Sequence, residues 1–310
     1  MNKKILITGG TGTIGRSFIK EYPGYQYHSI SRNETLITKM KHDYPEVKNH
    51  IGSIEDREFI IRTFKKVKPD IVIHAAAIKH INIAELNPIQ TCRVNINGSL
   101  NIIEASVLAN VPITIGISTD KACSSMSLYG YTKLLMEKCF MEANTESNRF
   151  AVARFANVAH SNGSVLPFWL NLKSKGEPLR LTDPAMNRLI FSQSKAVQLI
   201  HRTIDLCKDE GGAFVGVYKM KTVNLLALAK VISEDIVIVG LRPGEKIDEE
   251  LISEAELPYT SVYDDLVVIG PEKNKNSNSL KTPISSATAP PMTVEELKLL
   301  IFGDEGSDND

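Results

Sequence analysis

The sequence has no excess of charge of either sign, because 36 Lys and Arg residues balance 36 Asp and Glu residues among 310 positions. A basic excess is what neutralises the phosphates of a nucleic acid or an anionic membrane surface, so its absence argues against both partners. No hydrophobic run reaches the length needed to span a bilayer, and residues 1–4 lead into a short apolar segment rather than a signal sequence. We therefore expect a soluble, cytoplasmic protein.

Cysteine is scarce and irregularly spaced. The four cysteines, Cys92, Cys123, Cys139 and Cys207, form no CxxC pair and no zinc-binding spacing. We expect reduced core residues, no disulfide framework and no metal site.

A glycine-rich turn lies near the beginning of the chain. Residues 4–8 are an apolar strand pattern, and the glycines at 9, 12 and 15 are followed by a helical pattern to about residue 21. Such glycines allow a tight turn, close approach of the backbone to a pyrophosphate and close packing of helix on strand. The N-terminus of the helix offers free N–H groups to the phosphates. We interpret the turn as a dinucleotide site, although loops are glycine-rich in any case.

The next expected strand, residues 25–31, ends at Ser31 and Arg32. An NAD site is expected to carry an acidic residue here for the ribose 2′-hydroxyl. A serine and a guanidinium suit a 2′-phosphate better, which favours NADP. The neighbouring Glu34 keeps NAD open, and Arg32 could be an ordinary surface residue.

Strand and helix patterns alternate along the first half of the chain. Further strands are expected at 47–54, 70–77, 113–117 and 150–158, and helices at 57–66, 87–109 and 129–140. The pattern predicts an α/β fold: a Rossmann-type doubly wound parallel sheet with a smaller C-terminal substrate-binding lobe. We expect a cofactor-binding domain over 1–160, a substrate lobe over 161–270 and a partly disordered tail over 271–310.

The chemistry is expected at the end of the 113–117 strand. Thr119, Asp120 and Lys121 follow this strand, while Tyr129 and Lys133 are one turn apart on the next helix. An ammonium group beside a phenol favours the phenolate, and such a Tyr can take the proton of an alcohol as hydride leaves its carbon. Each pair, taken alone, could be a solvated surface pair.

Together these segments resemble the extended short-chain dehydrogenase/reductases, and among them the C5-inverting UDP-N-acetylglucosamine 4,6-dehydratases. The resemblance covers nearly the whole chain and rests on residues 8–15, 31–32, 74–80, 118–122, 129–133, 154–158, 163–168, 182–188 and 240–246. The chain departs from the family pattern at Ser53, Asn187 and Leu189, among others.

The resemblance implies a role for each segment. Lys121 is expected to take the C5 proton of the sugar, and Asp120 to protonate the departing 6-hydroxyl group, next to Thr119, Tyr129 and Lys133. The expected cofactor is NADP and the expected partner a UDP-sugar, in a homo-oligomer (dimer or hexamer). The residues expected to bind the UDP-sugar are Lys79, Asn157, Arg242 and Glu245. The residues expected to hold the cofactor are Gly9, Thr11, Gly12, Thr13, Ile14, Gly15, Ser31, Arg32, Ala75, Ala76, Ala77, Tyr129 and Lys133.

Two other functions stay open. A nucleotide-sugar 4-epimerase needs only Thr119, Tyr129, Lys133 and a cofactor, and has no use for Asp120 and Lys121. A catalytically silent NADP-binding protein is the third possibility, against which the intact Thr-Tyr-Lys set argues.

Overall fold

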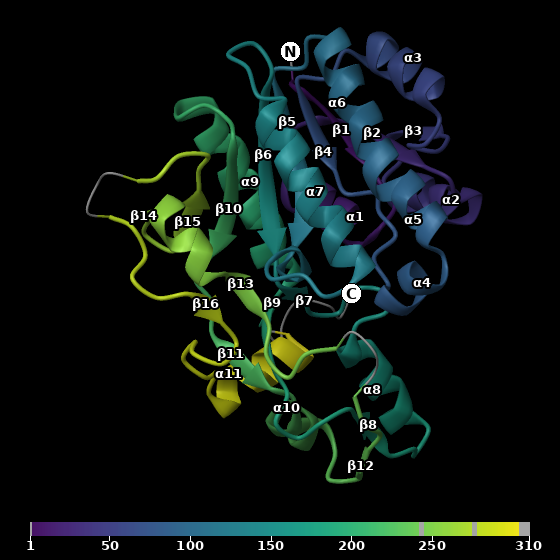
Figure 1. The fold of residues 1–310 in the computed structure, drawn as a ribbon. Coiled ribbons are helices and arrows are strands. Elements are labelled where there is room, and N and C mark those ends of the chain that lie inside the picture. The colour runs from purple at the N-terminus through teal and green to yellow at the C-terminus, as the bar shows by residue number, and fades with distance from the viewer. Residues whose placement is uncertain (1, 242–244, 275–277, 304–310) are drawn as a thin grey trace.

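The computed structural model describes residues 2–241, 245–274 and 278–303 (Figure 1). Its centre is a nine-stranded sheet in the order β14-β15-β10-β6-β5-β4-β1-β2-β3. The strands of this sheet are β1 (Lys4–Thr8), β2 (Gln26–Ser31), β3 (Lys48–Ile51), β4 (Ile71–His74), β5 (Ile113–Thr119), β6 (Arg149–Phe155), β10 (Phe214–Tyr218), β14 (Thr260–Tyr263) and β15 (Leu266–Ile269).

Seven of these strands, from β3 to β10, are parallel, which confirms the predicted doubly wound sheet. Their side chains alternate between two hydrophobic clusters, because successive residues of a strand face opposite sides. In β1, Ile5 and Ile7 belong to one cluster and Leu6 to the other. Both faces of the sheet are therefore buried, as in parallel sheets generally.

Helices cover both faces. The first cluster includes Phe18 of α1 and Leu199 of α9, and the opposite cluster includes Phe64 of α3 and Ile102 of α6. The helices between the sheet strands are α1 (Thr13–Glu21), α2 (Glu34–Asp43), α3 (Arg57–Val67), α4 (Ile81–Leu86), α5 (Pro88–Cys92), α6 (Gly98–Leu108), α7 (Leu128–Glu142) and α9 (Gln193–Asp209).

The remaining elements lie below the carboxyl edge of the sheet in Figure 1 and include a separate hydrophobic cluster around Trp169, Leu228 and Leu297. They form three small sheets, β11-β9-β7, β12-β8 and β13-β16. Their strands are β7 (Asn157–Val158), β8 (Leu179–Leu181), β9 (Asn187–Phe191), β11 (Thr222–Asn224), β12 (Ile236–Ile238), β13 (Glu250–Ile252) and β16 (Ile284–Ser285), with helices α8 (Val165–Ser174), α10 (Leu225–Ile232) and α11 (Val294–Phe302). The division of the chain at residue 160 stays a prediction.

The structure differs from the sequence expectations in several elements. The helix expected over 87–109 is three segments, with a π-helical turn at Arg93–Asn97 between α5 and α6. The strand expected over 150–158 divides after Phe155, and Asn157 and Val158 pair with β9 instead. The strands β14 and β15 extend the large sheet in the antiparallel direction. Among the described residues, no helix is long and apolar enough to cross a membrane. Residues 304–310, part of the expected disordered tail, lie outside the described residues.

Candidate active site

The residues expected to carry the chemistry gather at the carboxyl edge of the large sheet. Thr8, Ser31, His74 and Thr119 are the last residues of β1, β2, β4 and β5. Because these strands are parallel, all four ends lie at one edge, and the loops that follow them line it.

The glycine turn between β1 and α1 has the shape that a dinucleotide requires. Gly9 has φ +70°, and a Cβ there would lie 3.1 Å from the backbone of Ala76. A Cβ on Gly15 would lie 2.3 Å from the Gly10 carbonyl oxygen, so the helix packs directly on the turn. By contrast, a Cβ on Gly12 would meet only the Gly9 carbonyl oxygen within 4 Å, which leaves open space beside the turn. No side chain caps α1, and its first turn carries no acidic residue. These features fit a pyrophosphate group.

The other residues expected at the cofactor surround this turn. The Thr11 and Ser31 hydroxyl oxygens are 2.8 Å apart. Ile14 packs against the first hydrophobic cluster, the one that contains Ile5 and Ile7. The backbone N–H of Asn162 donates to the Thr13 hydroxyl at 3.3 Å. The chain from Ala75 to Ala77 is half-buried beside Gly9. The structure thus brings the ends of β1, β2 and β4 together around one loop.

Arg32 lies at the rim of this group. Its guanidinium is 3.6 Å from the Glu55 carboxylate, and its side chain is 59% exposed. The neighbouring Asn33 caps α2, because its side chain accepts from the N–H of Leu36 at 2.9 Å. Glu34, the residue that kept NAD open, is the first residue of that helix.

A compact acid–base cluster follows β5. The Thr119 hydroxyl donates to Asp120 Oδ1 at 2.8 Å, and Lys121 Nζ lies 3.0 Å from the same oxygen. The Asp120 side chain is 1% exposed and that of Lys121 22%. The strand end therefore holds a carboxyl and an ammonium group side by side at the wall of a cavity.

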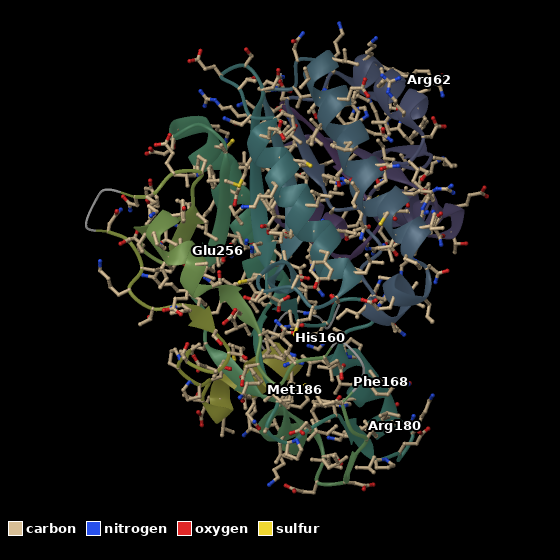
Figure 2. The ribbon with its side chains drawn as sticks, in the orientation of Figure 1. Arg62, His160, Phe168, Arg180, Met186 and Glu256 are labelled. Atoms are coloured by element: carbon tan, nitrogen blue, oxygen red, sulfur yellow. The ribbon has the colours of Figure 1, made fainter. Side chains whose placement is uncertain are left out.

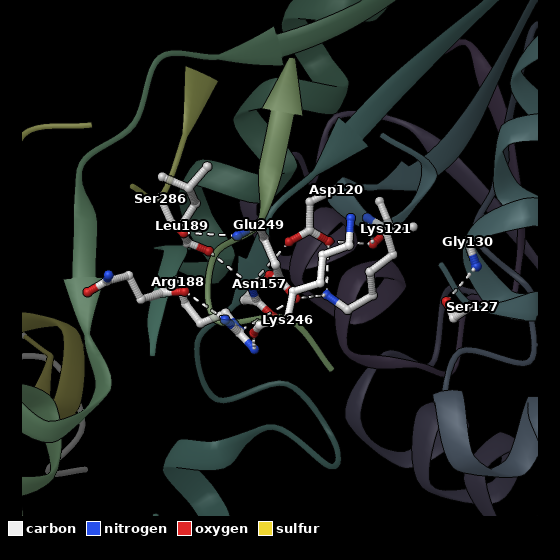
Figure 3. A network of polar contacts seen from close by, with 12 residues as sticks. Asp120, Lys121, Ser127, Gly130, Asn157, Arg188, Leu189, Lys246, Glu249 and Ser286 are labelled. Carbon is white, nitrogen blue, oxygen red and sulfur yellow. Dashed lines mark hydrogen bonds and ion pairs between the residues drawn. The ribbon is translucent and has the colours of Figure 1, made fainter. Parts of the chain in front are cut away.

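A third ionisable group, which the sequence analysis missed, completes this cluster. Glu249 Oε1 lies 3.1 Å from Lys121 Nζ, and Asn157 Nδ2 donates to both Asp120 Oδ2 (3.2 Å) and Glu249 Oε2 (3.0 Å). Figure 3 shows the two carboxyl groups meeting between Lys121 and Asn157. The only signal in the sequence was the acidic run 248–250, one residue after the 240–246 motif.

Arg188 fastens the segment that carries Glu249. Its guanidinium donates to the carbonyl oxygens of Lys246 and Ile247, both at 2.9 Å, and its Nε lies 3.4 Å from Glu249 Oε1 (Figure 3). Arg188 had been noted within a motif, but it was not among the expected site residues.

The cluster shifts the ionisation of its members. Burial, followed by the negative charge of Glu249, raises the pKa of Asp120 to about 7. Burial alone would lower the pKa of Lys121, but the charges of Asp120 and Glu249 raise it above its usual value. Burial would raise the pKa of Glu249, yet Lys121 and Arg188 hold it well below its usual range. Near neutral pH, Asp120 is therefore the carboxyl group that can carry a proton.

The expected effect of Lys133 on Tyr129 is wrong for this structure. Burial raises the pKa of Tyr129 to about 12, while the charges that act on it come from Lys121 and Asp120. The Lys133 ammonium group instead contacts Met136 Sδ at 3.0 Å, and burial lowers its pKa to about 8. The two residues are on the same helix, as predicted, but the charged neighbour of Tyr129 is the Asp120–Lys121 pair.

The cavity beside the cluster measures about 170 Å³ and is lined by residues of the β5–α7 loop and of 245–250, including Glu245. Asn157 lines it too, whereas exposed Lys79 donates to the Asn162 carbonyl oxygen at 2.8 Å. Arg242 lies outside the described residues. No group of three or more His, Cys, Asp or Glu residues with metal-binding geometry occurs in the described part of the chain.

Known proteins resemble the chain over nearly its whole length. It is 33% identical to an uncharacterized membrane protein of Methanocaldococcus jannaschii, over 97% of this chain and 95% of that protein. It is 35% identical to the UDP-N-acetylglucosamine 4,6-dehydratase (inverting) of Campylobacter jejuni, over 87% of this chain and 83% of that protein. The crystal structure of Pen from Bacillus thuringiensis superposes with a TM-score of 0.89 at 28% identity, over 97% of both chains.

The family comparison agrees with the resemblance first noted in the motifs. Residues 5–271 match the family described as "Polysaccharide biosynthesis protein". The matched range includes the glycine turn after β1, the site between β5 and α7, and the segment that carries Glu249. The chain therefore belongs to this polysaccharide biosynthesis family, within the extended short-chain dehydrogenase/reductases.

Proposed function

We propose that this protein is a UDP-N-acetylglucosamine 4,6-dehydratase that inverts C5 and acts in the synthesis of a surface polysaccharide or glycan. The observation that carries this proposal is the pair of buried Asp120 and half-buried Lys121 beside Thr119 at the wall of the cavity. Removal of water across C5 and C6 needs a base for the C5 proton and an acid for the departing hydroxyl group. The 35% identity with an inverting dehydratase over most of the chain supports the same reaction.

The Asp120–Lys121 pair can generate both forms that the elimination needs. Transfer of one proton from the Lys121 ammonium to Asp120 Oδ1, 3.0 Å away, produces a neutral amine and a carboxylic acid together. The amine takes the C5 proton, and the acid gives its proton to the leaving 6-hydroxyl group as water. These two transfers restore the ammonium and the carboxylate. The raised pKa of Asp120 supports its role as the acid, because its carboxyl group carries a proton more readily near neutral pH.

The side chains that act in the oxidation at C4 are those of Thr119, Tyr129 and Lys133. Thr119 and Tyr129 are hydrogen-bonded neighbours beside Asp120, so their hydroxyl groups can hold the sugar 4-hydroxyl between them. Burial raises the pKa of Tyr129, so its side chain is a neutral phenol near neutral pH. It can accept the proton of the sugar 4-hydroxyl only if it gives its own phenolic proton to another group. Burial lowers the pKa of Lys133, one turn away on the same helix, to about 8, so its neutral amine form is accessible near neutral pH and can take up the proton that the phenol releases. A bound nicotinamide nucleotide would supply the hydride acceptor for C4 oxidation and return the hydride to C6.

The cofactor that we propose is NADP. The glycine turn, Thr11 and Ser31 fit a dinucleotide phosphate, and Arg32 lies directly after β2 with an exposed guanidinium. A guanidinium suits the additional 2′-phosphate of NADP. Lys79, Asn157, Arg242 and Glu245 stay our proposed ligands of the UDP-sugar.

Incubation with UDP-N-acetylglucosamine tests the function directly. A dehydratase forms a product lighter by one water molecule, and in D2O the product carries deuterium at C5. NMR of the sugar ring then reports the configuration at C5. A product of unchanged mass would identify a 4-epimerase, for which Thr119, Tyr129 and Lys133 suffice. Tight NADP binding without any turnover would identify a silent binding protein.

We also propose a homo-oligomer. Large apolar side chains are exposed on neighbouring helices, among them Leu86 of α4, Ile89 of α5 and Tyr131 of α7, at 79%, 71% and 55%. An exposed apolar area of this kind favours contact with another subunit. Size-exclusion chromatography with light scattering tests the proposal, and a monomer at micromolar concentration would contradict it.

A further inference from the structure

Glu249 is almost completely buried in the acid–base cluster, yet it does not belong to the Asp120–Lys121 pair that performs the proposed elimination. It comes from the segment before β13, 129 residues after Asp120 in the chain. Its Oε1 lies 3.1 Å from Lys121 Nζ and 3.4 Å from Arg188 Nε, and its Oε2 accepts from Asn157 at 3.0 Å. A buried carboxylate with three such partners is held in one position.

The backbone around Glu249 is also fixed. The Glu249 N–H donates to the Ser286 hydroxyl at 2.9 Å, and its carbonyl oxygen accepts from the Ser286 N–H at 2.8 Å. Arg188 donates to the carbonyl oxygens of Lys246 and Ile247, in the same segment. The segment therefore presents the carboxylate to Lys121 and Asp120 from a rigid support.

The charges in the cluster are balanced in two pairs. Asp120 and Lys121 form one pair, and Glu249 and Arg188 the other. When a proton moves from Lys121 to Asp120, the attraction between Glu249 and Lys121 is lost, but so is the repulsion between the two carboxylates. The protonated Asp120 can in addition donate a hydrogen bond to Glu249. The Glu249 carboxylate thus acts on both members of the pair: it stabilises the ammonium form of Lys121 and the protonated form of Asp120.

We infer that Glu249 is a positioning residue for the acid–base step: it holds the Lys121 ammonium group and accepts the hydrogen bond of protonated Asp120. This inference rests on the proposed function for its catalytic meaning. The coupling of Glu249 to Asp120 is a property of the protein itself and can be measured without any substrate. Three further charged groups line the same cavity: Glu245, Lys246 and Glu250.

Glu249→Gln tests the inference, because it keeps the shape of the side chain and removes its charge. Infrared difference spectroscopy follows the protonation of buried carboxyl groups, and Asp120→Asn assigns the Asp120 band. In the unsubstituted protein, Asp120 is expected to titrate near pH 7. In Glu249→Gln, its midpoint is expected to fall by about 1–3 units, since a neighbouring negative charge is lost. Glu254→Gln, at an exposed position shortly after β13, is the matched control and should not shift it.

The rate of the dehydration reaction provides a second measurement. Dehydration of UDP-N-acetylglucosamine by Glu249→Gln is expected to slow by about 10²-fold through misplacement of the pair, with NADP binding unchanged. If the Asp120 midpoint shifts but the unsubstituted protein forms no dehydrated product, the positioning role stands and the proposed function fails. If Glu249→Gln leaves the Asp120 midpoint in place, the positioning role is wrong, whatever reaction the protein performs.

A second variant covers the case in which Glu249→Gln does not fold. Glu249→Asp keeps the charge but withdraws it by one methylene group from Lys121. We expect the Asp120 midpoint to fall in the same direction by a smaller amount. A midpoint identical to that of the unsubstituted protein would overturn the inference.

Discussion

Lys121 contacts both carboxyl groups of the cluster, those of Asp120 and Glu249. Its replacement should therefore impair the elimination step while leaving cofactor binding intact. In Lys121→Met the glycine turn, Arg32 and Lys133 are untouched, so NADP should bind nearly as before. Elimination should fall by roughly 10²–10⁴-fold, the usual cost of losing a general acid–base group. Reduced nicotinamide is expected to accumulate after addition of UDP-N-acetylglucosamine, which its absorbance reports.

The control for this variant is Lys173→Met, at an exposed position of α8 outside the cavity. It should dehydrate the substrate at the rate of the unsubstituted protein. Dehydration by Lys121→Met at an undiminished rate would remove Lys121 from the mechanism.

Arg32 decides the choice between the two cofactors in our proposal. Its contact with Glu55 is long and exposed, so little holds the guanidinium away from a nucleotide. Arg32→Asp should weaken NADP by about 1.5–3 kcal/mol, the value of a charge-assisted contact, and NAD by much less. Calorimetric titration with both nucleotides measures this difference. Arg62→Asp, at an exposed position of α3 at the top of the molecule in Figure 2, should change neither affinity. Equal losses of both affinities in Arg32→Asp would show that Arg32 does not bind the 2′-phosphate.

At the scale of elements, one buried arginine joins the C-terminal part of the chain to the large sheet. Arg154 of β6 contacts Glu137 of α7 at 2.7 Å and Glu256 at 2.8 Å, and donates to the carbonyl oxygen of Leu251 in β13 at 2.9 Å. Glu256 belongs to the 3₁₀ helix Glu254–Tyr259, which directly follows β13 (Figure 2). The same link therefore helps to hold the strand next to Glu249.

Replacement of Arg154 should destabilise the protein strongly. In Arg154→Met, the buried carboxylate of Glu137 loses its partner, which costs about 3–5 kcal/mol of the free energy of unfolding. Urea denaturation measures the loss. Arg180→Met is the matched control, because Arg180 pairs with Glu177 at the surface at 3.8 Å and such pairs contribute about 0–1 kcal/mol. Equal stabilities of the two variants would contradict the importance of the buried link.

The sequence predicted correctly those features that depend on neighbouring residues in the chain. Alternating strand and helix patterns predicted the parallel sheet. The helix α2 was missed, because its mixed sequence shows little amphipathic pattern.

Contacts between distant segments were beyond the sequence. Glu249 meets Lys121 only because β13 returns to the edge of the sheet, and no spacing in the chain records this. The spacing of Tyr129 and Lys133 correctly placed both on one helix. It did not reveal that burial dominates the Tyr129 pKa, because burial depends on the assembled fold.

At the scale of the whole molecule, buried histidines link stability to pH. His28 of β2 lies beside His50 of β3, with ring nitrogens 2.9 Å apart, and burial followed by the charge of His50 lowers the pKa of His28 to about 4. His74 is fully enclosed between Thr8 and Ser99, and burial lowers its pKa to about 3. The unfolded chain, with histidine pKa values near 6.5, takes up these two protons as the pH falls, and the folded protein does not.

The titration of Asp120 changes the free energy of unfolding in the opposite direction. Its pKa of about 7 means that the folded protein takes up a proton that the unfolded chain binds only near pH 4. Between about pH 6.5 and 4, the unfolded chain thus binds two histidine protons that the folded protein lacks, and the folded protein binds one aspartate proton that the unfolded chain lacks, a net difference of one. The free energy of unfolding should therefore fall by about 1.4 kcal/mol for each unit of decreasing pH, and burial of His50, which lowers its pKa too, adds to the fall.

Urea denaturation at several pH values across this window measures the slope. Asp120→Asn removes the opposing proton, so its stability should fall about twice as steeply, by about 2.7 kcal/mol per unit. A stability that does not change between neutral pH and pH 4, or an Asp120→Asn slope equal to that of the unsubstituted protein, would contradict the opposing titrations of the histidines and Asp120.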